Sequence, residues 1–147
     1  MTVPDRDVLA STAALLDQGE RIDRISRAVT VTALATLAAF GVFDVNKPAA
    51  AVLLASSVLT GVAASYLAIR VGFDAALFRR MADAPDRPDF SKLDGALTAL
   101  GLLAAAKAGR PLESRANGAC RLFRCLAGLA VTQVILFLIG AVLAMPH

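Results

Sequence analysis

The sequence predicts an all-α integral membrane protein whose three transmembrane helices extend into a cytoplasmic four-helix bundle. Of the 147 residues, 57% are hydrophobic and 18% are charged, whereas an ordinary soluble domain has about 45–50% and about 25%. Three long uncharged runs, with basic residues gathered almost entirely on one side of them, favour the same class. A chain of this length forms one membrane domain, 1–147.

Composition also excludes other classes of protein. Ala, Leu and Val dominate and the net charge is only +3, so the chain is not intrinsically disordered. Two cysteines are too few for a disulfide scaffold. With 10 Gly and 6 Pro the chain is not collagen-like or of low complexity. A small polytopic membrane protein remains.

Three uncharged runs define the predicted spans. The second and third, 48–69 and 125–146, have 22 residues each, roughly 33 Å of helix for a hydrocarbon core of about 30 Å. The first run, 28–43, reaches only about 24 Å, and snorkelling of Arg27 helps to complete a span over 28–45. A cleavable signal peptide is the alternative for this span, but five acidic residues precede it, unlike a short basic leader segment.

Basic residues give the expected topology. Four precede the first span and ten lie between the second and third, whereas Lys47 alone lies between the first and second. Because basic residues remain in the cytoplasm, we expect the N-terminus and the long loop inside and His147 outside, in the inner (plasma) membrane. This rule explains the basic loop without nucleic-acid binding, since aspartates alternate with its charges and aromatic residues are sparse.

The segment before the first span is predicted to be an amphipathic helix over 4–27, continuous with the span. Pro4, Asp5 and Asp7 suit a helix start, and Gly19 is the weak point. Three acid-to-base pairs at i,i+4 lie opposite one apolar face. That face comprises Val8, Leu15, Ile22, Ile25 and Val29.

The other cytoplasmic helices are predicted over 70–83, 92–107 and 111–124. The helix 70–83 continues the second span and ends before Pro85. The second contains an uncharged run of 12 residues, which is too short to cross a membrane. The third begins at Pro111 and continues into the last span. Each helix has one apolar stripe to bury, so together with the N-terminal helix they predict a four-helix bundle.

Small residues recur at intervals of one helical turn within the second and third spans. Such a column lets two helix backbones approach closely, which matters because lipid provides no hydrophobic drive for helix association. The sequence leaves open whether the contact is within one copy, between copies or with a partner membrane protein. The predicted packing or oligomer-interface residues are Ser57, Gly61 and Ser65, and Gly128, Thr132 and Gly140.

Polar residues in and beside the spans are the remaining candidates. Tyr66, Arg70 and Asp74 form an i,i+4 column that is predicted to face inward, with an ion pair at the membrane boundary. The pair either fixes helix register or acts as a switch or conduction site. Gln133 is the only amide inside the third span and is predicted to hydrogen-bond between helices, with a substrate contact as the alternative.

No residue pattern indicates catalysis or a cofactor. The sequence has no catalytic triad, metal cluster or phosphate-binding Gly-rich loop. His147 is the only histidine and lies at the C-terminus, which disfavours haem ligation. Cys120 and Cys125 lie about 140° apart on a helix, so they cannot hold one metal together and are predicted packing residues. We expect no cofactor and no enzymatic activity.

Two functions remain open. The first is a non-enzymatic subunit, scaffold or accessory protein of a membrane complex or homo-oligomer. The alternative is a small oligomeric channel or transporter, which needs a polar stripe through the bilayer. The polar residues of the spans are mostly small hydroxyls that can bond to their own helix, and no carboxylate falls inside the three uncharged runs. The sequence therefore favours the first.

The topology is tested with reporters. A reporter fused after His147 is expected to report the external side, because the last span leads outward. A reporter inserted at Asp86 is expected to report the cytoplasm, because ten of the 15 basic residues share its loop. An external signal at Asp86 contradicts the three-span topology.

Overall fold

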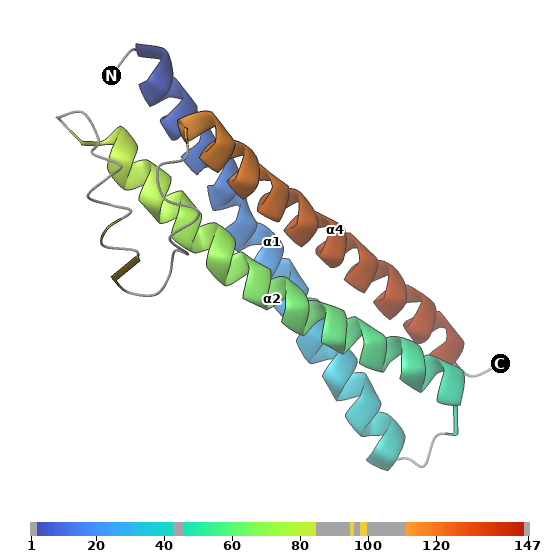
Figure 1. Cartoon of the computed structure of the whole chain (residues 1–147). Coiled ribbons are helices and arrows are strands. Elements are labelled where there is room, and N and C mark those ends of the chain that lie inside the picture. Colours follow the sequence, from blue (N-terminus) through green and yellow to red (C-terminus); the bar gives the residue numbers. More distant parts are fainter. Residues whose placement is uncertain (1–2, 43–45, 85–94, 96–97, 100–110, 146–147) are drawn as a thin grey trace.

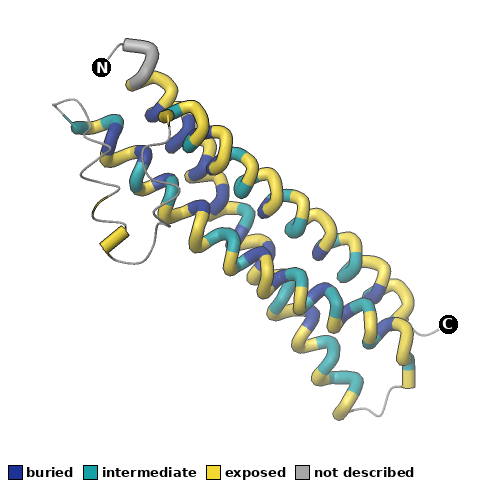
Figure 2. The backbone as a smooth tube through the Cα atoms, viewed as in Figure 1, coloured by how far each residue is buried: buried dark blue, intermediate teal, exposed yellow. Residues whose placement is uncertain are grey.

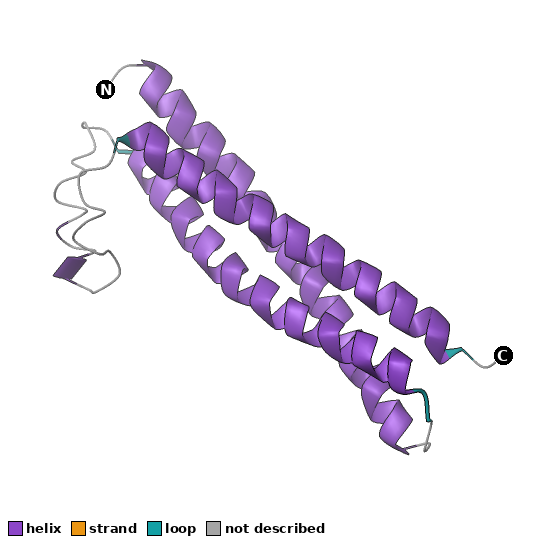
Figure 3. Cartoon of the chain, turned by 45° about the vertical axis from the view of Figure 1, so that its right-hand side comes forward, coloured by secondary structure: helices purple, strands orange, loops and turns teal. Residues whose placement is uncertain are grey.

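The computed structural model consists of three long helices that run side by side in an up-down-up arrangement (Figure 1). No strand occurs among the residues that the structure describes, so the all-α prediction is confirmed (Figure 3). The described residues are 3–42, 46–84, 95, 98–99 and 111–145. The helices are α1 (Val3–Val42), α2 (Pro48–Ala82) and α4 (Leu112–Ala144).

The described helices form a three-helix bundle. The predicted fourth helix, 92–107, falls outside the described residues except at 95 and 98–99. The predicted segments 4–27 and 28–45 are one helix, α1, up to Val42. In the same way α2 continues from the predicted span into the following cytoplasmic segment without a break.

Each helix is longer than a membrane is thick. The helices α1, α2 and α4 have 40, 35 and 33 residues, which gives lengths of about 60, 52 and 50 Å. Each contains an apolar stretch of 18 residues with at most two charged ones. By length and composition all three helices can therefore cross a hydrocarbon core of about 30 Å, as in a multi-pass membrane protein, and still project beyond it.

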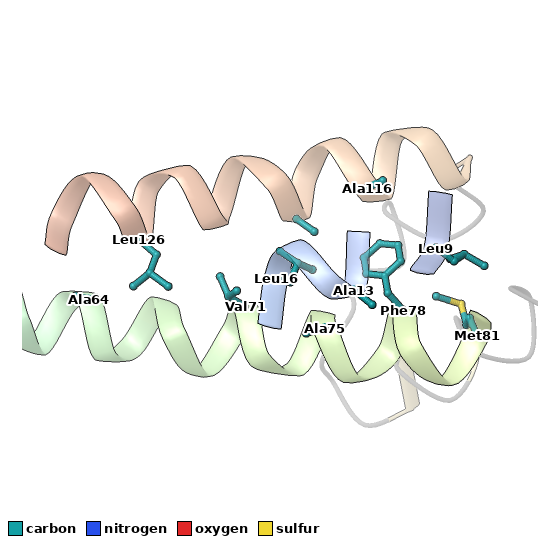
Figure 4. Packing of buried hydrophobic residues seen from close by; sticks show 11 residues of the cluster. Leu9, Ala13, Leu16, Ala64, Val71, Ala75, Phe78, Met81, Ala116 and Leu126 are labelled. Atoms are coloured by element: carbon teal, nitrogen blue, oxygen red, sulfur yellow. The ribbon is translucent and has the colours of Figure 1, made fainter. Parts of the chain in front are cut away.

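One half of the bundle has a core of large apolar side chains. This half holds the N-terminus of α1, the end of α2 and the start of α4 (Figure 1). Leu9, Leu16 and Leu126 are at most 1% exposed, and Phe78 and Val71 pack with them (Figure 4). A core of this kind is what the hydrophobic effect produces in water.

The other half has the opposite distribution. Its buried positions are mostly small or polar, whereas most of its large apolar residues are exposed. Exposed positions are yellow and buried ones dark blue in Figure 2. Leu59 is 71% exposed, Val31 is 65% exposed and Val142 is 57% exposed. Helices in lipid associate through small residues and hydrogen bonds, since lipid is as apolar as leucine. This half matches the predicted spans.

The buried face of α1 differs from the apolar face that the sequence predicts. Val8, Leu15 and Ile25 are 39%, 42% and 60% exposed. Hydropathy misses the true face because most of its members are small or polar residues, whose low hydropathy does not mark them as buried. The buried face comprises Leu9, Thr12, Ala13, Leu16, Gly19, Asp23 and Ser26.

Gly19 is a close packing point rather than a weak point of α1. A Cβ atom there would lie 2.9 Å from Cγ1 of Val71 and 3.5 Å from Cδ2 of Leu126. These contacts come from both neighbouring helices, and the α1 backbone approaches them because the residue has no side chain. The helix runs through this position unbroken.

Lys47 holds the opposite end of the bundle together. Its Nζ donates a hydrogen bond to the carbonyl oxygen of Ala144 at 2.8 Å and another to that of Met145. These carbonyls end α4, where a positive charge complements the helix dipole. Pro48 then occupies the first turn of α2, where its missing N–H costs nothing. The one basic residue between the first two spans is thus a helix cap.

Candidate functional site

Gln133 on α4 links all three helices through a set of hydrogen bonds. Its Oε1 accepts from Ser26 Oγ at 2.5 Å. Its Nε2 donates to the Ser26 carbonyl oxygen at 3.0 Å and to Thr30 Oγ1 at 2.8 Å. The backbone carbonyl oxygen of Gln133 accepts a hydrogen bond from Ser57 Oγ on α2 at 3.1 Å. Ser26, Thr30, Ser57, Gly61 and Gln133 are called the Gln133 cluster below.

The Gln133 cluster is closed to the outside. Gln133 and Ser57 are 0% exposed and Ser26 is 1% exposed. Both N–H groups of the Gln133 amide donate and its oxygen accepts from Ser26, so the amide has no free donor for a substrate. Its chemistry is that of a packed interhelical joint, the use expected of an amide within a span.

Gly61 makes this joint sterically possible. A Cβ atom at Gly61 would collide with Oγ1 of Thr30 and with Nε2 of Gln133, and would lie 3.1 Å from the Gln133 Cδ. The backbone of α2 therefore lies directly against the hydrogen-bonded side chains. Ser57, one turn away, is buried as well, whereas Ser65 is half-buried. The first part of this small-residue column packs within a single copy of the chain.

The small residues of α4 do not share one environment. Gly140 is buried, and a Cβ atom there would lie 3.1 Å from Cγ of Leu54. Thr132 and Gly128 are exposed, and nothing lies within 4 Å of a Cβ built at Gly128. Gly140 thus contributes to packing in the bundle, while Gly128 and Thr132 lie on its outer surface.

The column of Tyr66, Arg70 and Asp74 lies on the outside of α2, not on the inward face that the sequence favours. Tyr66 is 61% exposed and Arg70 is exposed, whereas Asp74 is half-buried. The ion pairs among the described residues do not include one between Arg70 and Asp74. The inward face of α2 is occupied instead by the stripe that contains Gly61 and Val71.

A charged groove of about 300 Å³ lies between α1 and α2. It is closer to the N-terminal end of α1 than the Gln133 cluster is. Three α1 carboxylates line it, those of Asp17, Glu20 and Asp23. Arg79 of α2 pairs with Asp17 across the groove, and Arg27 Nη2 lies 2.5 Å from Asp23 Oδ2. The groove therefore presents charges of both signs.

Asp23 is the unusual member of this groove. It is 7% exposed, and its Oδ1 is buried without a hydrogen-bond partner among the described residues. Buried polar oxygens are almost always hydrogen-bonded. The sequence marks Asp23 only as half of an i,i+4 pair with Arg27 on a polar face. The missed signal is its position three residues before Ser26, on the same side of α1.

Other candidate chemistry is limited. The described residues contain no group of three or more His, Cys, Asp or Glu side chains that could hold a metal ion. Cys120 is half-buried and Cys125 is exposed, and both are free thiols. Comparison with known proteins gave no match to a family model, to a curated protein or to a solved structure.

Gly61→Ala is expected to lower the free energy of unfolding by about 1–3 kcal/mol, as overpacking does in a tight core. The added methyl group meets Thr30 and Gln133. Gly128→Ala is the matched control, because the same methyl group enters open space there. Thermal unfolding in mild detergent measures both variants. Equal stability of the two contradicts the close contact at Gly61.

Asp74→Asn is expected to stabilise the fold near neutral pH. Burial raises the pKa of the Asp74 carboxyl above its ordinary value of 3.8, and the nearby Arg70 guanidinium lowers it by less. A raised folded-state pKa means that stability falls as the pH rises from the ordinary value through the folded one. The advantage of Asp74→Asn in thermal unfolding should therefore vanish at low pH. A loss of stability at neutral pH supports a favourable ion pair with Arg70 instead.

Proposed function

We propose that the chain is a non-enzymatic, multi-pass inner-membrane protein that acts as a subunit, scaffold or accessory protein of a membrane complex or homo-oligomer. The observation that carries this proposal is the closed Gln133 cluster. In the predicted spans the buried amide is fully engaged in joining helices, and a conduction path needs free polar groups along its length. The N-terminus and the long loop lie in the cytoplasm in this proposal.

The hydroxyl groups of the spans support the same function. Thr32 and Thr36 donate to carbonyl oxygens four residues earlier in α1, both at 2.9 Å. Ser56 and Thr60 do the same within α2, both at 2.8 Å. Hydroxyls used in this way satisfy themselves in lipid and do not form a polar stripe.

Exposed apolar side chains outside the predicted spans provide a surface for a partner. Val8 and Leu15 of α1 are 39% and 42% exposed, and Phe73 of α2 is 48% exposed. Apolar residues on a cytoplasmic surface favour contact with another chain. The proposal also retains a fourth cytoplasmic helix over 92–107, whose apolar stripe needs a partner of the same kind.

The alternative of a small oligomeric channel or transporter is favoured by one observation, the charged groove. Asp23 carries a buried carboxylate five residues before the predicted first span, and ionisable groups near a span are candidates for ion or proton pathways. In a single copy the described residues that line the groove include apolar α2 residues but none of the Gln133 cluster. A path would need several copies.

Native mass spectrometry of the full chain from mild detergent, combined with bilayer recordings, tests the proposal. A defined homo-oligomer or a stoichiometric complex with one membrane protein, without current, is the expected result. Leu15→Glu is expected to dissociate the assembly, because it places a charge on the exposed apolar surface. Gln18→Glu is the control, because Gln18 is an exposed polar residue of the same helix. This variant is expected to keep the assembly intact. A monomer with a reproducible, charge-dependent current contradicts the proposal.

A further inference from the structure

The charged groove contains an unsatisfied group, in contrast to the Gln133 cluster. Asp23 lines the groove and is 7% exposed, and its Oδ1 has no hydrogen-bond donor among the described residues. A buried carboxylate oxygen without a donor is costly. The terminal torsion of an aspartate is soft, so either carboxylate oxygen can turn towards the groove while the other takes the inner position. A ligand that brings N–H donors would bond to the oxygen that faces the groove.

The charges of the groove restrict what such a ligand can be. Arg27 and Arg79 line it together with the carboxylates, and their side chains are 63% and 55% exposed. A simple cation is repelled by these guanidinium groups, and a simple anion is repelled by the carboxylates. A zwitterion matches both, with an ammonium group towards Asp23 and a phosphate towards a guanidinium, which binds phosphate through paired N–H donors.

The α2 wall of the groove is apolar and open. Ile69 is 68% exposed, and nothing lies within 4 Å of a Cβ atom built at Gly72. Ile69 is also the last residue of the predicted second span, so the groove lies where lipid headgroups meet the protein. Its volume of about 300 Å³ is at the lower end for a ligand site, which suits a headgroup whose acyl chains remain in lipid.

We propose that this groove binds the phosphoethanolamine headgroup of a membrane phospholipid, with the primary ammonium donating to Asp23 and the phosphate held by Arg27 or Arg79. The inference rests on insertion of the helices in a membrane. It does not depend on the scaffold role, because the site lies between two helices of one copy.

The test compares two lipids on the full-length protein. The protein is reconstituted with equal amounts of phosphatidylethanolamine and phosphatidylcholine that carry the same acyl chains, and the lipids retained are counted by native mass spectrometry. Phosphatidylcholine has no N–H donor on its headgroup. We expect retention of phosphatidylethanolamine to be about tenfold higher, the effect of one charge-assisted hydrogen bond.

Two variants and one control variant localise the effect. Gly72→Leu fills the groove from its open wall and should abolish the preference, whereas Gly118→Leu, also on a helix position with nothing within 4 Å, should keep it. Asp23→Asn should reduce the preference while the amide retains the shape of the side chain. Thermal unfolding verifies that each variant is folded, and the oligomer mass in the same spectra reports separately on the scaffold role.

Three results overturn the proposal. The wild-type protein retains both lipids equally, or folded Gly72→Leu keeps the full preference. In the third, soluble phosphoethanolamine raises the unfolding temperature as much as the lipid does, which assigns the groove to a free amine phosphate.

Discussion

The hydrogen bonds between Gln133 and Ser26 are the constraint on which the bundle depends. The two residues lie on α4 and α1, and the carbonyl oxygen of Gln133 reaches Ser57 on α2. In the apolar environment of the predicted spans, an unsatisfied amide costs several kcal/mol. A slip of one helix along another leaves this amide without partners, whereas apolar contacts tolerate such a slip. The amide therefore sets the axial register of α4 against α1, and the bond from Ser57 to the Gln133 backbone carbonyl oxygen adds α2.

The contacts at both ends of the bundle agree with that register. At the end where the chain turns from α1 to α2, Lys47 reaches the last carbonyls of α4. Towards the other end, Gly19 meets Val71, and Arg79 pairs with Asp17. Between these contacts the interior changes from small and polar residues to leucine and phenylalanine. One chain thus packs by close approach in one half and by hydrophobic burial in the other.

The sequence predicts the helices better than it predicts their faces. Uncharged runs determine the apolar stretches, and the absence of a side chain at Gly61 already indicates a close approach. The inward face of α1 and the outward position of Tyr66 could not be predicted in this way, because hydropathy assumes that apolar residues are inside. In a helix partly surrounded by lipid, apolar residues also lie on the outer surface, so polarity does not tell which face of the helix points into the bundle. Only the packing of the three helices, with the bonds from Gln133 to Ser26, reveals that Ser26 and Asp23 are buried.

The two buried polar residues Gln133 and Asp23 differ in whether their polar atoms have hydrogen-bond partners. Gln133 is buried and hydrogen-bonded within the bundle, so its presence is explained without a ligand. Asp23 lies three residues from Ser26 on the same side of α1, is nearly as buried, and keeps one oxygen without a donor. A chain that gained only stability from this position would do better with an apolar residue, since a half-satisfied buried carboxylate is worse than none. Under the lipid-headgroup proposal this charge is explained by what enters the groove from outside, and the groove's position beside the predicted span makes lipid the neighbour nearest to it.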